Sequence, residues 1–157
     1  MTLAAPSYAV AADVYALIFT NSQDNNSQRL DSQIYSAIAI SGVDVDEIRC
    51  DTSTAAKWEK CAHEVFDRDI VPVFNKWVGL PGFAAIIDAK SKRVIGCLGS
   101  GLSANEMATE LRKMGAQASG GAYLSRANYK FSHEKSYIIK ISTSSNTTQC
   151  PAAHNVY

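Results

Sequence analysis

The architecture of this chain can be inferred from one stretch near its middle, Leu80-Pro81-Gly82-Phe83-Ala84-Ala85-Ile86-Ile87-Asp88. Phe83 to Asp88 is a run of apolar residues typical of a buried strand, and Gly79 to Gly82 before it contains residues that commonly form turns. Ala89 to Lys92 then predicts a second turn and Arg93 to Leu98 a returning strand. The stretch therefore predicts a β-hairpin that begins directly after a proline-containing turn.

Two strands and a helix between them precede the hairpin. Val14 to Phe19 is a continuous apolar run, as expected of a strand buried on both faces of a sheet. Residues 28–41 carry apolar side chains at helical spacing and are followed by Gly42, which predicts an amphipathic helix that ends there. Val45 to Cys50 predicts the second strand. Because a helix connects the two strands, we expect them to lie parallel.

A second helix is expected between the second strand and the hairpin. Thr52-Ser53-Thr54 supplies hydroxyls that can cap its start, and Trp58 and Cys61 share its apolar face. Residues 67–78 stay ambiguous, because Pro72 must lie near a helix start or break the helix.

The last helix of the pattern follows a capping box. Ser103 has Glu106 three residues later, and the helix that they begin is expected to end at Gly115. The order is then strand, helix, strand, helix, hairpin and helix. This order predicts an α/β fold with a central mixed sheet and flanking helices.

The composition fits one globular domain and excludes several classes of protein. The chain has 157 residues, 15 basic against 15 acidic side chains, and 46% hydrophobic residues. A neutral chain without a long basic run gives no electrostatic reason to expect a nucleic-acid partner. We expect no membrane span, since no apolar stretch approaches the roughly 20 residues that cross a bilayer, and the hydrophobic content is too high for a disordered chain.

Residues 13–115 resemble the thioredoxin fold. The stretch from Leu80 to Asp88 looks like the segment in which that family places a cis-proline just before its third strand. The resemblance implies that the Leu80–Pro81 bond is cis and that the residue before the proline presents backbone groups to an extended peptide. The chain is accordingly divided into an N-terminal arm or signal-peptide remnant, a thioredoxin-like domain and a C-terminal extension with a short strand: residues 1–12, 13–116 and 117–157.

The chain departs from redox-active members of that family at the start of the first helix. Those members place a Cys-x-x-Cys there, where the helix N-terminus lowers the pKa of a thiol. Asp24 and Ser27 fall at the two cysteine positions, and neither side chain can exchange disulfides. The structural interpretation of the segment is a capped helix start. The resemblance implies in addition that Asp24 and Asn25 lie beside Leu80 and Pro81 at a binding surface.

The four cysteines leave more than one pairing open. Cys50 closes the second strand and Cys61 lies on the following helix. They form either a structural disulfide, which would add about 2 to 3 kcal/mol of stability, or two buried free thiols. Cys97, in the returning strand, is expected to be a core residue, and Cys150, beside Pro151 in a polar tail, to be exposed. An even number of cysteines agrees with an oxidising compartment but does not require one.

No metal or cofactor site is predicted. His63 lies two positions after Cys61, a spacing that points the two side chains apart on a helix. His133 and His154 belong to separate segments. Gly99-Ser100-Gly101 precedes a capping residue and is interpreted as a turn, not as a phosphate loop or a dinucleotide fingerprint.

The two ends of the chain leave alternatives open. Residues 1–12 are uncharged and rich in alanine, like the tail of a secretory signal, but the basic start of such a signal is missing. A periplasmic or secreted protein and a cytoplasmic one with an N-terminal arm are both compatible with this pattern. Tyr137 to Ile141 predicts a short strand that either adds to the edge of the same sheet or pairs with another subunit or partner.

Two functions are compatible with the sequence. The first is a redox-inactive thioredoxin-fold protein that acts as a protein-binding or assembly component, with a protein or peptide partner or as a homo-oligomer. The alternative is an enzyme, a divergent thiol-disulfide oxidoreductase that uses Cys50 and Cys61. The missing Cys-x-x-Cys favours the non-catalytic function, with binding expected at Asp24, Asn25, Leu80 and Pro81.

Overall fold

The strand β1 (Val14–Thr20) lies at the centre of the sheet, as its apolar sequence predicts. Leu17 and Ile18 point to opposite faces and both are fully buried. β1 pairs in parallel with β2 (Val45–Asp51) and antiparallel with β3 (Phe83–Asp88). With a neighbour at each edge and apolar side chains on both faces, β1 requires helices on both sides of the sheet.

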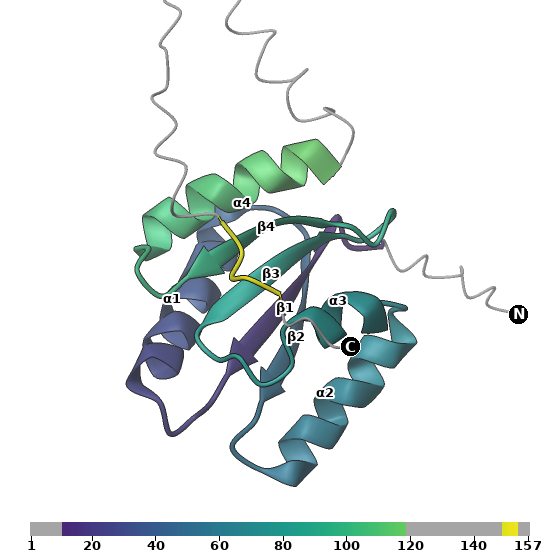
Figure 1. Cartoon of the computed structure of the whole chain (residues 1–157). Helices are drawn as coiled ribbons and strands as arrows, with labels where there is room; N and C mark the ends of the chain where they lie inside the picture. The colour runs from purple at the N-terminus through teal and green to yellow at the C-terminus, as the bar shows by residue number, and fades with distance from the viewer. Residues whose placement is uncertain (1–10, 119–148, 154–157) are drawn as a thin grey trace, which may run out of the picture.

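The computed structural model describes residues 11–118 and 149–153, and Figure 1 shows its sheet enclosed between helices. β4 (Val94–Gly99) pairs antiparallel with β3, so the strand order is β2-β1-β3-β4. The prediction of an α/β fold with a central mixed sheet and flanking helices is confirmed. The expected strand at 137–141 lies outside the described residues.

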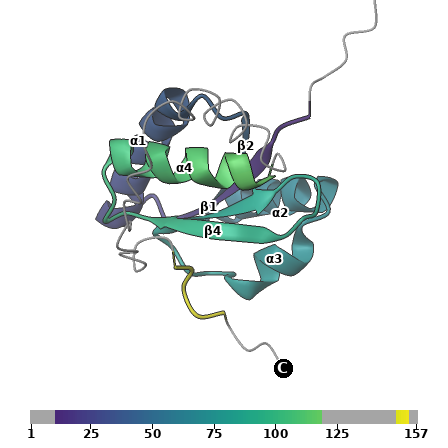
Figure 2. The same cartoon turned by 90° about the horizontal axis from the view of Figure 1, so that it is seen from above.

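The helices divide between the two faces of the sheet (Figures 1 and 2). On one face lie α1 (Asn25–Ser41) and α4 (Ala104–Ala118), which pack against each other. On the other lie α2 (Ala55–Asp67) and α3 (Val71–Lys76). Pro72 stands in the first turn of α3, where its missing N–H breaks no helical hydrogen bond, and this resolves the ambiguity of residues 67–78.

Each face of the sheet has its own core. Side chains of one face of β1 and β3 pack with α1 and α4 around Leu30, Ile34, Met107 and Leu111. Side chains of the opposite face pack with α2 and α3 and form an aromatic cluster: Phe19, Trp58, Phe74, Trp77 and Phe83. The alternation of side chains along β1 and β3 therefore fixes which helix covers which face.

Two helix boundaries differ from those expected. α1 begins at Asn25 and not at 28, because Asp24 caps a polar first turn that carries no apolar pattern. α4 continues through Gly115 to Ala118. A Cβ built at Gly115 would lie 2.9 Å from Cγ1 of Val43, so the glycine serves close packing and does not end the helix. The expected end of α1 at Gly42 is confirmed by its left-handed φ of 70°.

Gly115→Ala should destabilise the fold although alanine is the better helix former. The substitution gains up to about 1 kcal/mol of helix propensity but overpacks the contact with Val43, which typically costs about 1 to 3 kcal/mol. Chemical denaturation should therefore show a net loss of stability for G115A. The loss should shrink when Val43→Ala is added, relative to the sum of the two single variants. Additive effects, or a stabilised G115A, would contradict the close packing.

Candidate functional site

The strand directions bring several loops to one end of the sheet. β1, β2 and β4 end there, and β3 begins there, since Phe19 and Gly99 both pair with Phe83. We call this the loop end. It consists of the residues that follow β1, follow β2, precede β3 and follow β4: 21–24, 52–54, 79–82 and 100–103. The N–H of Gly82 donates to the carbonyl of Phe19 at 2.8 Å, which places the loop before β3 against the end of β1.

The start of α1 is a closed capping network. The Asp24 carboxylate accepts hydrogen bonds from the backbone N–H and the hydroxyl of Ser27, each at 3.0 Å. The Ser27 hydroxyl accepts in turn from the N–H of Asn21, and Ser27 is only 1% exposed. Asn25 is exposed beside them. The capped helix start is confirmed. Asp24 and Ser27, which stand where redox-active members of the family have cysteines, are hydrogen-bonded to each other.

The expected cis bond at Leu80–Pro81 is wrong, because no peptide bond among the described residues is cis. Two glycines make the reversal in its place: Gly79 has φ 83° and Gly82 has φ 96°, conformations that favour glycine. The N–H of Leu80 donates to the carbonyl of Trp77 at 3.1 Å and closes the turn. The N–H of Leu80 is therefore engaged within the turn, while Pro81 itself is exposed.

Asp51 ties the loop after β1 to the loop after β2. Its carboxylate accepts hydrogen bonds from the N–H of Ser22 at 3.2 Å and of Ser53 at 2.9 Å, and from the ammonium group of Lys57 at 2.8 Å. Burial raises the pKa of Asp51, but the hydrogen bonds from Lys57, Ser53 and Ser22 outweigh it and hold that pKa well below its usual range. Asp51 is thus an ionised structural link at the loop end.

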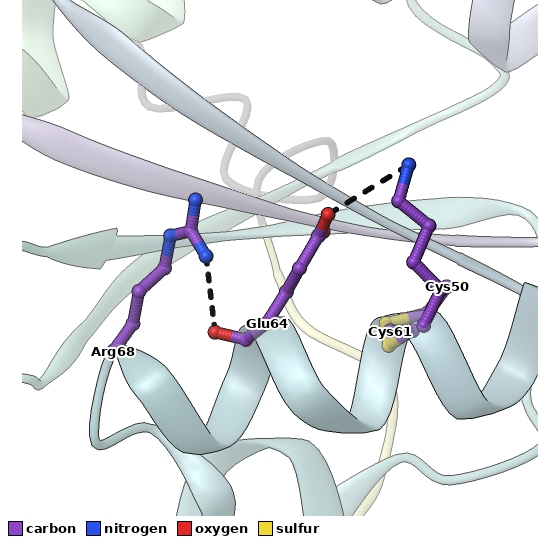
Figure 3. The surroundings of a disulfide bond; sticks show 5 residues. Cys50, Cys61, Glu64 and Arg68 are labelled. Atoms are coloured by element: carbon purple, nitrogen blue, oxygen red, sulfur yellow. Dashed lines mark hydrogen bonds and ion pairs between the residues drawn. A yellow bond between two sulfur atoms is a disulfide. The ribbon is translucent and has the colours of Figure 1, made fainter.

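Cys50 and Cys61 form a disulfide between β2 and α2, with Cα atoms 5.0 Å apart (Figure 3). Both residues are fully buried. Directly after the C-terminal end of α2, the Arg68 guanidinium binds both carboxylate oxygens of Asp46, at 2.6 and 3.0 Å, and these hydrogen bonds raise the pKa of Arg68. α2 is therefore fastened to β2 at its middle, through Cys61, and just after its C-terminal end, through Arg68. Of the two interpretations left open for Cys50 and Cys61, the disulfide holds.

Cys97 and Cys150 form a second disulfide that the sequence did not predict. Cys150 is half-buried, so its expected exposure is corrected. The carbonyl of Pro151 accepts a hydrogen bond from the indole N–H of Trp77 at 2.9 Å. Figure 2 shows the stretch 149–153 on the same side of β4 as α3. A separation of 53 residues hides this pair, and the even number of cysteines was the only signal for it.

The second disulfide borders a groove of about 420 Å³ at the loop end. Among the residues that the structure describes, none with a charged side chain lines it. Pro81 and Gly82 contribute from the loop before β3, Gly99 and Gly101 from the end of β4, and Gln149 and Pro151 from the C-terminal stretch. A Cβ built at any of the three glycines would meet no atom within 4 Å. The backbone is therefore open to the groove at these positions.

The structure brings some of the predicted site residues together and separates others. Pro81 lines the groove, whereas Asp24 and Asn25 do not. A smaller hollow of about 310 Å³ lies at the start of α2, bordered by Thr54, Trp58 and Gly79 among others. Within residues 11–118 and 149–153, no group of three or more His, Cys, Asp and Glu is arranged to hold a metal ion. No helix in these ranges is long and apolar enough to cross a membrane.

Asp51→Asn should lower stability at neutral pH by about 1.5 to 3 kcal/mol, the usual size of a hydrogen bond to a charged group. Because the folded pKa of Asp51 lies below the unfolded one, its stabilisation is complete above about pH 4 and is lost as the pH falls further. Denaturation at several pH values should show a weaker loss of stability in acid for D51N than for the wild type. Asp67→Asn, at an exposed aspartate of α2, is the control. Parallel profiles for D51N and the wild type would refute the assignment.

Comparison with known proteins identifies no relative from which a function could be transferred. No family model, no curated protein and no solved structure matches this chain. The function must therefore be argued from the loop end itself.

Proposed function

We propose that this chain is a non-catalytic, protein-binding domain of thioredoxin-like architecture that holds an extended, uncharged polypeptide in the groove at the loop end. The observation that carries the proposal is the groove itself. Its described lining carries no charge, and the backbone of Gly82, Gly99 and Gly101 is exposed to it. Gly82 is required by its turn, but glycine in a strand, as at Gly99, is one of the marks of a site where a ligand or another backbone approaches closely.

The topology supports the architectural part of the proposal. A parallel pair joined by a helix, followed by an antiparallel hairpin in the order β2-β1-β3-β4, is compatible with a thioredoxin-like arrangement. The helices α1 and α4 on one face and α2 on the other agree with it. The glycine turn in place of a cis-proline is a departure that moves peptide recognition away from Leu80.

The state of the cysteines supports a role without dithiol chemistry at the helix start. All four cysteines are in disulfides, and the start of α1 offers the capping carboxylate of Asp24 in place of a thiol. The alternative, an oxidoreductase that uses Cys50 and Cys61, would require a substrate thiol to reach two fully buried residues. Two disulfides also support an oxidising compartment for this chain, outside the cytoplasm.

The edge strands favour the groove side of the sheet for binding. β2 is rich in charge, and its Arg49 forms ion pairs with Asp31 and Glu47. Charged edges discourage pairing with another strand. β4, at the opposite edge, reads VIGCLG and carries no charge. An extended polypeptide of neutral side chains can therefore follow β4 into the groove, with main-chain hydrogen bonds supplying affinity.

Filling the groove should weaken binding. The probe is a fluorescein-labelled peptide of alternating Thr and Val, whose binding is measured by fluorescence anisotropy. Gly99→Leu adds a side chain where the backbone has no left-handed φ and the space is open, so it should weaken binding at least about tenfold, or 1.4 kcal/mol, without unfolding the sheet. Ala39→Leu, at an exposed position of α1, is the matched control and should bind like the wild type.

A second probe separates backbone pairing from apolar contact. Methylation of alternate peptide nitrogens removes donors but keeps the side chains, so the methylated peptide should bind as weakly as the unmodified peptide binds G99L. Three outcomes would each refute the proposed function. They are equal affinity of the wild type for both peptides, equal affinity of G99L and the wild type for the unmodified peptide, and no binding to the wild type. Self-association through the groove would appear as a dimer that light scattering detects in the wild type and not in G99L.

The wild-type chain should not catalyse the reduction of insulin by dithiothreitol above the background rate. Asp24 and Ser27 leave no thiolate at the start of α1, and Cys50 and Cys61 are buried. Cys150 lies in an irregular stretch and not at the start of a helix, so its pair with Cys97 lacks the arrangement of a disulfide reductase. Turbidity of the released insulin chain measures the rate. Clear turnover that disappears in Cys50→Ser would instead establish the oxidoreductase alternative.

A further inference from the structure

The two disulfides lie in unlike surroundings. Cys50 and Cys61 are fully buried between β2 and α2. Cys97 is 2% exposed, but its partner Cys150 is half-buried and belongs to the stretch 149–153, which forms neither helix nor strand. Cys150 is therefore the most exposed of the four cysteines, whereas Cys50 and Cys61 become accessible only when α2 separates from the sheet.

The stretch 149–153 depends on the second disulfide for its position. Its other described attachments are the hydrogen bond from Trp77 to Pro151 and the apolar contacts of Cys150 with the core. Gln149, Pro151, Ala152 and Ala153 are exposed. One hydrogen bond does not offset the conformational entropy lost when a short irregular stretch is ordered. Without the disulfide, the stretch should therefore leave the sheet.

The same stretch forms part of the groove. Gln149 and Pro151 border it together with Pro81 and Gly82, and Cys97 also lines it. We propose that Cys97–Cys150 is a thiol-exchange site that controls the groove. A dithiol reductant opens it while Cys50–Cys61 stays oxidised, and departure of the stretch widens the groove beside Phe83. This inference rests on the disulfide, and it holds whether or not the groove binds a polypeptide.

The exchange requires only a dithiol. One of its thiolates attacks the sulfur of Cys150, because that is the more exposed partner; the bond to Cys97 breaks, and Cys97 leaves as a thiolate that takes a proton from water. The second thiolate of the dithiol attacks the sulfur now bound to Cys150, displaces Cys150 as a thiolate and forms the oxidised dithiol. Two electrons pass to the protein, and one dithiol is consumed for each disulfide opened, so the step is stoichiometric.

The test follows the two disulfides separately in the full chain. The protein is treated with limiting dithiothreitol, samples are quenched with iodoacetamide over time, and peptide mass mapping measures labelling at each cysteine. Cys97 and Cys150 should be labelled together and at least about tenfold faster than Cys50 and Cys61, as expected when exposure decides the rate. Equal rates, or faster labelling of Cys50 and Cys61, would overturn the proposal.

A second measurement reports whether the stretch leaves. Nuclear magnetic resonance of the indole N–H groups should show a shift for Trp77, which loses the Pro151 carbonyl, and no comparable shift for Trp58. The double variant Cys97→Ser with Cys150→Ser should show the shifted Trp77 signal without any reductant. If the Trp77 signal does not move after Cys97 and Cys150 are labelled, the proposal that residues 149–153 leave the sheet is overturned. Failure of the Thr/Val peptide to bind would count against the proposed function alone.

Discussion

The pairing of β1 with β3 is the interaction on which the loop end depends. β1 is buried on both faces and bonded along both edges, so its position is fixed by the whole sheet. The pairing extends to the residue before β3, through the hydrogen bond from the N–H of Gly82 to the carbonyl of Phe19. That bond holds the loop before β3 against the end of β1. Glycine at positions 79 and 82 permits the turn, since both residues have a left-handed φ.

From this end of the sheet, two covalent links extend in different directions. Cys50–Cys61 joins β2 to α2 inside the core, near the Asp51 network that connects the loops after β1 and β2. Cys97–Cys150 joins β4 to a stretch far along the chain and places it beside the groove. The first link supports the scaffold, and the second shapes the surface that the scaffold presents. Burial distinguishes their roles, because exchange with external thiols requires access.

Local patterns were sufficient to predict most of the sheet and its helices. The apolar run of β1, the hairpin of β3 and β4, and the reciprocal bonds between Ser103 and Glu106 all follow from residues close in sequence. Gly115 was misinterpreted as a helix end because its reason, the contact with Val43, is tertiary.

The candidate site was only partly predictable. Pro81 lies at the loop end and lines the groove. The cis isomer of its bond is implied only by the resemblance, and the two flanking glycines make the turn without it. The Cys97–Cys150 pair joins β4 to a segment with no regular secondary structure, so no periodic pattern predicts that they meet. Because the disulfide places Gln149 and Pro151 at the groove, the groove cannot be predicted without the pairing of Cys97 with Cys150.

Hydrogen exchange measured by mass spectrometry, with and without the alternating Thr/Val peptide, tests most directly whether the loop end is a polypeptide-binding surface. Binding along β4 and into the groove predicts slower exchange in residues 79–83 and 95–101, with the start of α2 around 55–58 unchanged, because that second hollow is not the proposed site. Protection confined to residues 55–58, or no protection anywhere under conditions that saturate the protein, would contradict it.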